Sequence, residues 1–172
     1  MEGEKLNEAK AGVKVFIDAM DGGDWIAWVA FDNQIHPGPQ GLKRDMGPEL
    51  DNAINSTAAE GGNALYDAIL AAHKSLADKR SSDGDRWRYG LVVLSNGRDS
   101  SSTRITSSEL QALLDRLERD NPVGIKVHTI GIGSDADKVA LANIAASTNG
   151  RPWEALRPED VKKIYRELVK YY

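Results

Sequence analysis

The sequence predicts a single α/β domain over residues 1–172, with a doubly wound (Rossmann-like), mostly parallel sheet, one short antiparallel edge strand and helices on both faces. Three observations support this prediction. Strand-like apolar runs alternate with segments in which apolar residues recur at helical spacing. The run 91–94 is apolar throughout, which is typical of a strand covered by helices on both faces. A capping box at Thr106 and Glu109, together with several glycine turns, marks helix ends.

The first half of the chain opens with an amphipathic helix, and the double glycine at 22–23 ends it. Prolines shape the segment that follows the first strand, because proline cannot donate to a strand ladder and suits the first turn of a helix. The expected elements are a helix over 6–20, a strand over 25–31, an edge strand over 34–36 stopped by Pro37 and Pro39, a loop over 38–47, a helix from Pro48, and a longer helix over 65–76.

The second half begins with a charged, serine-rich stretch that indicates an exposed linker. Its strands and helices then alternate, with Ser134 expected to cap one helix and proline expected to begin another. The expected elements are a linker over 79–85, a strand over 91–94, a helix from the capping box to Asn121 and Pro122, a strand over 125–133, a helix over 134–149, a strand over 153–156, and a helix from Pro158.

Composition limits the function classes. The chain has a net charge of −4 and no basic stripe, so we expect no nucleic-acid partner. It contains no cysteine, which excludes disulfides, a thiol nucleophile and thiolate metal sites, and leaves the compartment open. No apolar run is long enough to predict a membrane span.

The alternation is incomplete at its start. Each later crossover helix follows a strand, but the first helix follows only residues 1–3. We therefore expect that a strand is missing before Met1 and that the domain is truncated at its N-terminus.

Four stretches carry a family resemblance when their order and spacing are taken together. They are 60–69 (EGGNALYDAI), 95–100 (SNGRDS) after its apolar strand, 127–134 (VHTIGIGS), and 141–145 (LANIA) with the tail that follows. Over essentially its whole length the chain resembles the von Willebrand factor A (VWA) domain. This is the fold of integrin inserted domains and of many bacterial surface proteins, and the chain resembles bacterial members in particular.

The resemblance implies a metal-ion-dependent adhesion site (MIDAS), where three loops hold a divalent cation with an Asp-x-Ser-x-Ser motif, a Thr and an Asp. Here the first loop would lie before Met1, while Asn63 stands at the Thr position and Asn96 at the Asp position. An amide oxygen carries no charge to offset dehydration of a hard cation. We therefore expect a degenerate site without bound cofactor. Asn63 and Asn96 are better interpreted as turn residues, and Mg²⁺ or Mn²⁺ would bind only if the first loop were restored.

The missing strand also has a structural consequence. In the family it is central and lies between the strands at 25–31 and 91–94, so both would face a gap. Three resolutions are available: direct pairing of the two strands, a strand borrowed from another copy, or a strand supplied by a partner chain. Direct pairing would move the flanking helices by about 4.8 Å and disturb their packing. We therefore expect self-association through the gap.

Two other groups of residues give weaker evidence for a binding site. Asp99, Ser101 and Thr103 imitate the missing cation loop, but a serine-rich connection explains them equally well. The turn 131–134 could place a phosphate on helix amides, although Ala136 breaks the dinucleotide pattern.

The sequence gives little support for a catalytic site. The histidines at 36, 73 and 128 have no mutual spacing that places two on one helix face, so each is interpreted as a packed or surface residue. No serine sits in a nucleophile elbow, and we expect no enzymatic activity. Of the tryptophans, only Trp87 is expected to be exposed.

Two functions remain. The first is a non-enzymatic, protein-binding module of adhesion or scaffold type, with an unidentified protein partner. Its contact surface would be formed by Asn33, Asn63, Asn96 and Ser134 at the carboxyl ends of the strands. The alternative is a regulatory domain that binds a small ligand or nucleotide at 131–134. The resemblance favours an extracytoplasmic or cell-surface location, and a cytoplasmic one stays open.

Overall fold

The computed structural model describes residues 3–58, 61–84, 86–96, 98–121, 124–157 and 159–171. Glu60 and Gly97 of the family motifs lie outside the described residues, as do Met1, Pro122 and Pro158. In chain order the elements are α1 (Glu4–Ala19), β1 (Trp25–Phe31), β2 (Ile35–Leu42), α2 (Lys43–Ser56), α3 (Leu65–Asp83), β3 (Gly90–Ser95), α4 (Ser107–Asp120), β4 (Lys126–Ile132), α5 (Lys138–Ala146), β5 (Pro152–Ala155), α6 (Asp160–Leu168) and the short 3-10 helix η1 (Val169–Tyr171).

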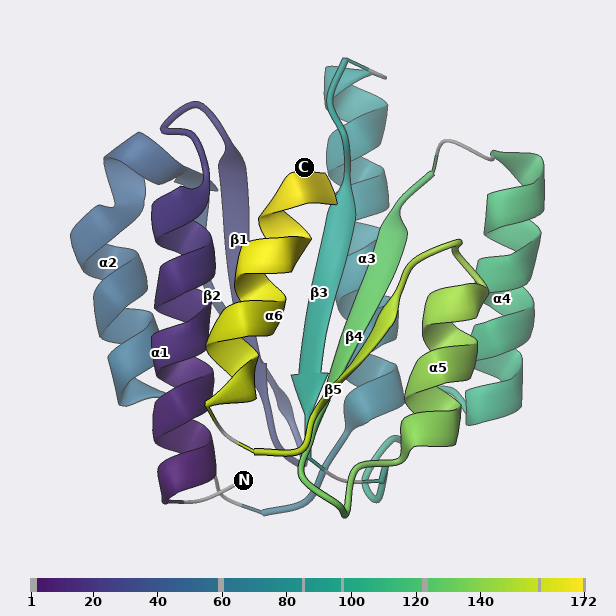
Figure 1. Ribbon diagram of the computed structural model, residues 1–172. Coiled ribbons are helices and arrows are strands. Elements are labelled where there is room, and N and C mark those ends of the chain that lie inside the picture. The colour runs from purple at the N-terminus through teal and green to yellow at the C-terminus, as the bar shows by residue number, and fades with distance from the viewer. Residues whose placement is uncertain are drawn as a thin grey trace.

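The strands form two separate sheets (Figure 1). β3, β4 and β5 make a parallel sheet in that order, whereas β1 and β2 form an antiparallel pair. This confirms the α/β class and the antiparallel edge strand. Among the described strands β1 and β3 do not pair, so direct pairing does not resolve the gap between them.

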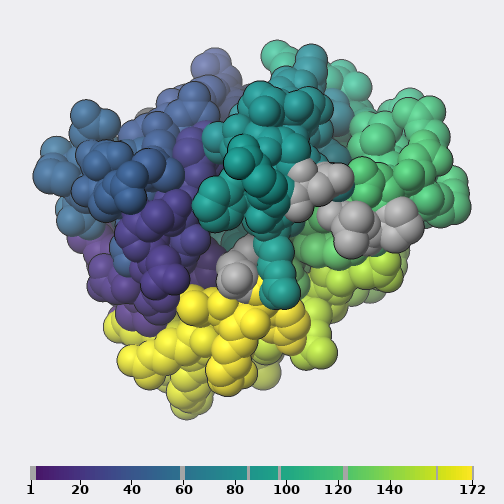
Figure 2. All heavy atoms as spheres, turned by 90° about the horizontal axis from the view of Figure 1, so that it is seen from above, coloured from purple at the N-terminus to yellow at the C-terminus, as the bar shows by residue number. Residues whose placement is uncertain are grey.

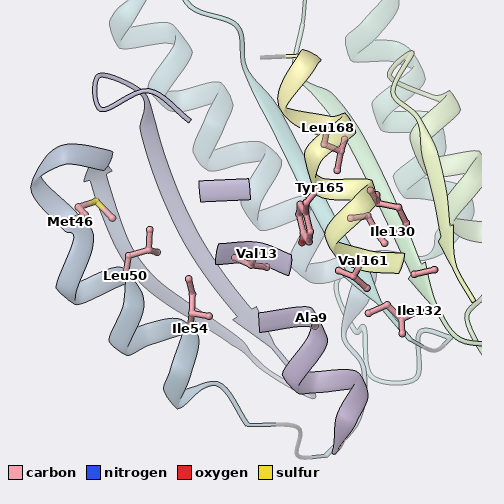
Figure 3. Packing of buried hydrophobic residues seen from close by; sticks show 12 residues of the cluster. Ala9, Val13, Met46, Leu50, Ile54, Ile130, Ile132, Val161, Tyr165 and Leu168 are labelled. Carbon is pink, nitrogen blue, oxygen red and sulfur yellow. The ribbon is translucent and has the colours of Figure 1, made fainter. Parts of the chain in front are cut away.

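Helices cover both faces of the strands. On one face α1, α2 and α6 pack into a core with β4, and on the other α3, α4 and α5 pack against β3 and β4. Figure 1 shows α6 in front of the space between β1 and β3, with α3 behind the sheet. Figure 3 shows the buried side chains of the first core, including Val13 of α1 and Tyr165 of α6.

The two ends of the chain meet in the contact between α1 and α6. Figure 2 shows the first helix in purple lying against the last in yellow. A Cβ on Gly12 would lie 2.5 Å from Val161 Cγ1 and 2.9 Å from Tyr165 Cδ2. The rings of Phe16 and Tyr165 are 5.4 Å apart. Glycine at position 12 therefore allows the two helices to pack closely.

β2 is longer than the edge strand expected at 34–36, and it passes through Pro37 and Pro39. The prediction of a stop at these prolines is wrong because β2 is an edge strand, where a missing N–H can face solvent. The register shifts between Ala27 and Val29, so the ladder is irregular beside the prolines. Here a Cβ on Gly38 would lie 2.8 Å from Trp28 Cδ1, so only glycine fits.

α2 begins at Lys43, which corrects both the loop expected over 38–47 and the helix start at Pro48. The backbone N–H groups of Lys43 and Arg44 donate to the carbonyls of Asp24 and Gly22, at 2.8 and 3.1 Å. These long-range bonds satisfy the first amides of the helix. Pro48 is therefore inside the helix, where it lacks the N–H that would bond the Arg44 carbonyl.

α3 runs to Asp83, so the linker expected over 79–85 is wrong as far as Asp83. Lys79 Nζ pairs with Asp83 at 2.9 Å, an i,i+4 pair that supports the last turn. Gly84, with φ of 74°, then ends the helix.

Two helix starts give opposite outcomes. The capping box of Thr106 and Glu109 is confirmed at α4. Ser134 does not cap α5; the Asp137 side chain does so by accepting from Ala140 N at 3.1 Å.

The exposure expected for Trp87 is confirmed, because 58% of this residue is exposed to solvent.

Candidate functional site

Asn63 fastens the loops where the strands end. Its side-chain Nδ2 donates to Ser95 Oγ at 3.2 Å and to the Arg98 carbonyl at 3.1 Å. A carbonyl oxygen can only accept, so the Arg98 contact fixes which end of the Asn63 amide faces this loop. The interpretation of Asn63 as a turn residue is therefore consistent with its contacts.

The backbone of Asn63 joins the same two loops. Its N–H donates to Ser100 Oγ at 3.0 Å, and its carbonyl accepts from the N–H groups of Ser100 and Ser101 at 2.9 and 3.2 Å. A Cβ on Gly62 would lie 2.0 Å from Ser101 Oγ, so this close approach requires glycine. The loop before α3 and the loop after β3 thus form one fastened unit.

Two aspartates anchor the serine-rich loop to α3. Asp99 Oδ1 accepts from the Tyr66 N–H at 3.2 Å and from Ser102 Oγ at 2.5 Å. The buried carboxylate of Asp67 accepts from the N–H of Thr103 at 2.9 Å and of Arg104 at 3.0 Å. The loop interpretation of Asp99 is confirmed, whereas the role of Asp67 was missed. Its place in the first turn of α3, where N–H groups attract anions, was the available signal.

Asp32 closes the end of β1. Its carboxylate accepts from the Gln34 N–H at 2.7 Å and lies 3.1 Å from His36 Nε2. The backbone bond from Gln34, followed by His36, lowers the pKa of Asp32. The Asp32 carbonyl accepts from Ala64 N at 2.6 Å, which ties β1 to the loop before α3.

The four residues expected to form a contact surface are only partly brought together. A Cβ on Gly61 would lie 3.3 Å from Asn33 Oδ1, so Asn33 borders the fastened loops. Asn96 lies with Asn63 along the wall of one cavity. Ser134 is exposed on the next loop, where its hydroxyl donates to Asp135, and no contact recorded among the described residues joins it to Asn63 or Asn96.

Arg98 links those two parts of the edge. Its Nε lies 3.8 Å from Asp137, and its side chain is 83% exposed. Sequence reasoning missed Arg98 as a surface residue, although it lies within the motif 95–100 at the end of β3. We call Asn33, Asn63, Asn96, Arg98 and Ser134 the loop surface.

A cavity of about 250 Å³ begins at the loop surface and runs between β1 and β3. Its sides are residues 28–32 and 91–96. Helices α1, α3 and α6 contribute further walls, and residues 57–58 and 61–63, between α2 and α3, complete the lining. The cavity occupies the place where the two sheets fail to pair. We call it the slot.

The buried histidines are packing residues, as expected. His128 Nδ1 accepts from the Arg151 N–H at 3.2 Å, and its ring lies 5.3 Å from that of Tyr171. Burial first, and then the charges of Arg151 and Lys126, lower the pKa of His128; burial alone lowers that of His73.

The turn 131–134, which could have held a phosphate but was better explained as a tight strand-to-helix turn, is bonded internally. The Gly133 N–H donates to the Ala155 carbonyl at 2.8 Å, and its φ of 79° requires glycine. The geometry of a tight strand-to-helix turn explains this glycine without a ligand.

The family model of the von Willebrand factor type A domain matches residues 1–167. The chain belongs to this family. An uncharacterized protein of Synechocystis sp., sll0103, is 23% identical over 170 residues, which are 99% of this chain and 38% of that protein. A VWA protein from Catenulispora acidiphila has a TM-score of 0.79 at 21% identity and covers 96% of this chain and 38% of its own.

A third neighbour holds a metal. It is proximal thread matrix protein 1 of the mussel byssus with a zinc-occupied MIDAS motif, with a TM-score of 0.71 at 19% identity, and the match covers 96% of this chain and 40% of that one. This chain thus spans well under half the length of the relatives described here.

The described residues at the two motif positions, Asn63 and Asn96, both carry side-chain amides. Within the described ranges no three His, Cys, Asp or Glu side chains come together as a potential metal group. Asn63, at the Thr position of the motif, turns its amide nitrogen toward Ser95, and a nitrogen bearing two hydrogens repels a cation. Asn96 contributes no charge at the Asp position.

Proposed function

We propose that this VWA domain is a non-enzymatic, protein-binding module of adhesion or scaffold type that uses the loop surface. The observation that carries the proposal is the double fastening of Asn63, through its side chain to Ser95 and Arg98 and through its backbone to Ser100 and Ser101. Loops held this firmly present side chains to a partner with little ordering cost. Protein–protein interaction is also the typical role of the family.

The proposal includes binding without a tightly held divalent cation. Support comes from the donor set, in which Asn63 and Asn96 replace the hydroxyl and carboxylate of the motif. The partner contacts would then be hydrogen bonds and ion pairs, for which exposed Arg98 is the strongest group on the surface.

An extracytoplasmic or cell-surface location is part of this proposal. It is supported by the neighbour from the mussel byssus, which is a thread matrix protein. Across the described residues, the helices are all too short or too polar to cross a membrane.

Site-directed photo-crosslinking tests the loop surface. A benzophenone amino acid at exposed Asn33 or Ser134 should give specific protein adducts in the source cells. Unlabelled wild-type protein should reduce the yield of these adducts, and unlabelled Arg98→Ala protein should reduce it less. The matched control carries the probe at exposed Arg119, near the other end of α4. Equal adducts at Arg119, or none at either loop position, would refute the proposal.

Ligand titration separates this function from its alternative. Calorimetry with Mg²⁺, Mn²⁺ and adenine or guanine nucleotides should give no heat of binding for a protein-binding module. Saturable nucleotide binding that is lost in a variant of the 131–134 turn would instead support a small-ligand domain.

A further inference from the structure

We propose that a cavity between α3 and α4 binds a small, uncharged molecule that has an apolar body and a hydroxyl group. The cavity has a volume of about 400 Å³, which is within the usual range of ligand pockets. It lies at the amino ends of the strands, because Gly124 and Ile125, which precede β4, line it. It shares no lining residue with the slot or the loop surface, so the proposal does not rest on either of them.

The main walls of the cavity come from one face of each of two helices. Helices α3 and α4 cover the same face of the parallel sheet (Figure 1). On α3 the lining residues include His73, Ala77 and Arg80, and on α4 they include Leu114 and Glu118. Spacing by three or four residues places each set on a single helix face. Because Ala77 carries only a methyl group, the space in front of it is left for a ligand.

His73 is the polar group of the cavity that packing does not explain. Only 8% of the residue is exposed, yet its ring has no hydrogen-bond partner in the part of the chain that the structure describes. Buried polar side chains are normally paired, so an unpaired imidazole that lines a cavity points to a ligand group. Burial lowers the pKa of His73, so at neutral pH its ring is uncharged and has one donor and one acceptor nitrogen. A ligand hydroxyl can pair with either nitrogen.

The other lining residues favour an apolar, uncharged body. Leu114, Leu117 and Ile125 form apolar walls, and Leu117 is 37% exposed. Among the described lining residues the permanently charged ones are Arg80 and Glu118, whose opposite signs give no net attraction for an ion. A cavity of about 150 Å³ holds one benzene ring, so this larger cavity has room for two fused rings.

Polar contacts hold the walls of the cavity in place. Arg80 Nη2 donates to Asn121 Oδ1 at 3.2 Å, which ties the last part of α3 to the end of α4. Glu118 Oε1 accepts from Asn149 Nδ2 at 2.8 Å and from Lys126 Nζ, which ties α4 to the turn after α5 and to β4. Walls that are already fixed bind a ligand with little ordering cost.

NMR spectra of the isotope-labelled protein test the class of ligand. The probe is 2-naphthol, and the matched control is naphthalene, which has the same rings and no hydroxyl. The probe should shift the ring nitrogen signals of His73 and the amide signals of segments 73–81 and 114–121. It should bind roughly threefold to tenfold more tightly than naphthalene. Equal affinities, no binding of 2-naphthol, or shifts confined to other segments would overturn the proposal.

Two substitutions of His73 test its hydrogen bond to the hydroxyl. His73→Phe keeps a ring without nitrogen, so it should abolish the preference for 2-naphthol over naphthalene while the cavity still accepts both compounds. His73→Gln keeps a donor and an acceptor and should retain part of the preference. A preference that is unchanged in His73→Phe would overturn the role of His73.

A matched pair of variants locates the ligand. Ala77→Leu fills the cavity from α3 and should weaken 2-naphthol binding roughly tenfold or more, whereas Ala71→Leu adds the same side chain at a half-buried position that lines neither cavity. Equal weakening by both variants would overturn the location. Arg98→Ala, on the loop surface, should leave the affinity for 2-naphthol unchanged, so this proposal and the proposed function fail separately.

Discussion

The Nδ2 atom of Asn63 lies 3.2 Å from Ser95 Oγ, so the loop before α3 is tied directly to the last residue of β3. The same nitrogen bonds the Arg98 carbonyl at 3.1 Å. One side chain therefore holds together the two loops that border the slot, and its removal has consequences for stability and for metal binding.

Asn63→Ala should lower the free energy of unfolding by about 1–3 kcal/mol, because both acceptors lose a partly buried donor. Urea denaturation measures the change. Asn33→Ala is the matched control, because Asn33 is exposed in a neighbouring turn, and its effect should stay within about 0.5 kcal/mol. Equal losses in the two variants would contradict the fastening role of Asn63.

The wild-type chain should show no heat of binding with millimolar Mg²⁺ or Mn²⁺ in calorimetry. Asn63 presents a donor where the motif has a Thr hydroxyl oxygen, and Asn96 presents a neutral amide where the motif has a carboxylate. Binding should return in a chain extended by an apolar strand ending in Asp-x-Ser-x-Ser and carrying Asn63→Thr and Asn96→Asp. Tight binding by the unaltered chain, abolished by Asn96→Ala, would refute the prediction.

Gly12→Ala should destabilise the protein even though alanine is the better helix former. A Cβ at Gly12 would lie 2.5 Å from Val161 Cγ1, so α1 and α6 must separate, at a cost of about 1–3 kcal/mol. Gly23→Ala, in the turn before β1, is the matched control, because its Cβ would meet nothing within 4 Å and its effect should stay within about 0.5 kcal/mol. Thermal and urea unfolding should therefore show a loss of stability for Gly12→Ala that Gly23→Ala does not share.

Much of this architecture was predictable because its signals are local. The alternation of strands and helices and the capping box at Thr106 follow from periodicity and short-range chemistry, whereas the gap beside the run 91–94 was expected from the family resemblance. The start of α2 was not predictable, because Lys43 and Arg44 are capped by carbonyls about 20 residues earlier in the chain. The prediction from Pro48 alone placed the start of α2 five residues too late.

The candidate site divides in the same way. Asn63 and Asn96 could be named because they follow motif spacing, whereas Asp67 acts through the backbone of a distant loop. Such a contact depends on how two loops fold over each other, and no spacing in the sequence encodes it. The slot was anticipated as a gap, but its apolar walls come from helices on both faces and needed the fold to be seen.

Buried histidines should make the protein less stable as the pH falls from about 7 to about 5. Burial lowers the pKa of both His73 and His128 below the unfolded value of about 6.5, and the charges of Arg151 and Lys126 add to the effect at His128. In this window the unfolded chain binds more protons than the folded one, so the free energy of unfolding decreases as pH decreases, by at most about 1.4 kcal/mol per pH unit for each histidine. The carboxylates with lowered pKa values, such as Asp32, lose their stabilising contribution only at lower pH.

Urea denaturation between about pH 7 and about pH 5 measures how the free energy of unfolding changes with pH. His128→Asn keeps an acceptor for the Arg151 N–H without a titrating ring, so it should reduce the slope, and adding His73→Gln should reduce it further. A slope that is unchanged in the double variant would show that other groups carry the pH dependence.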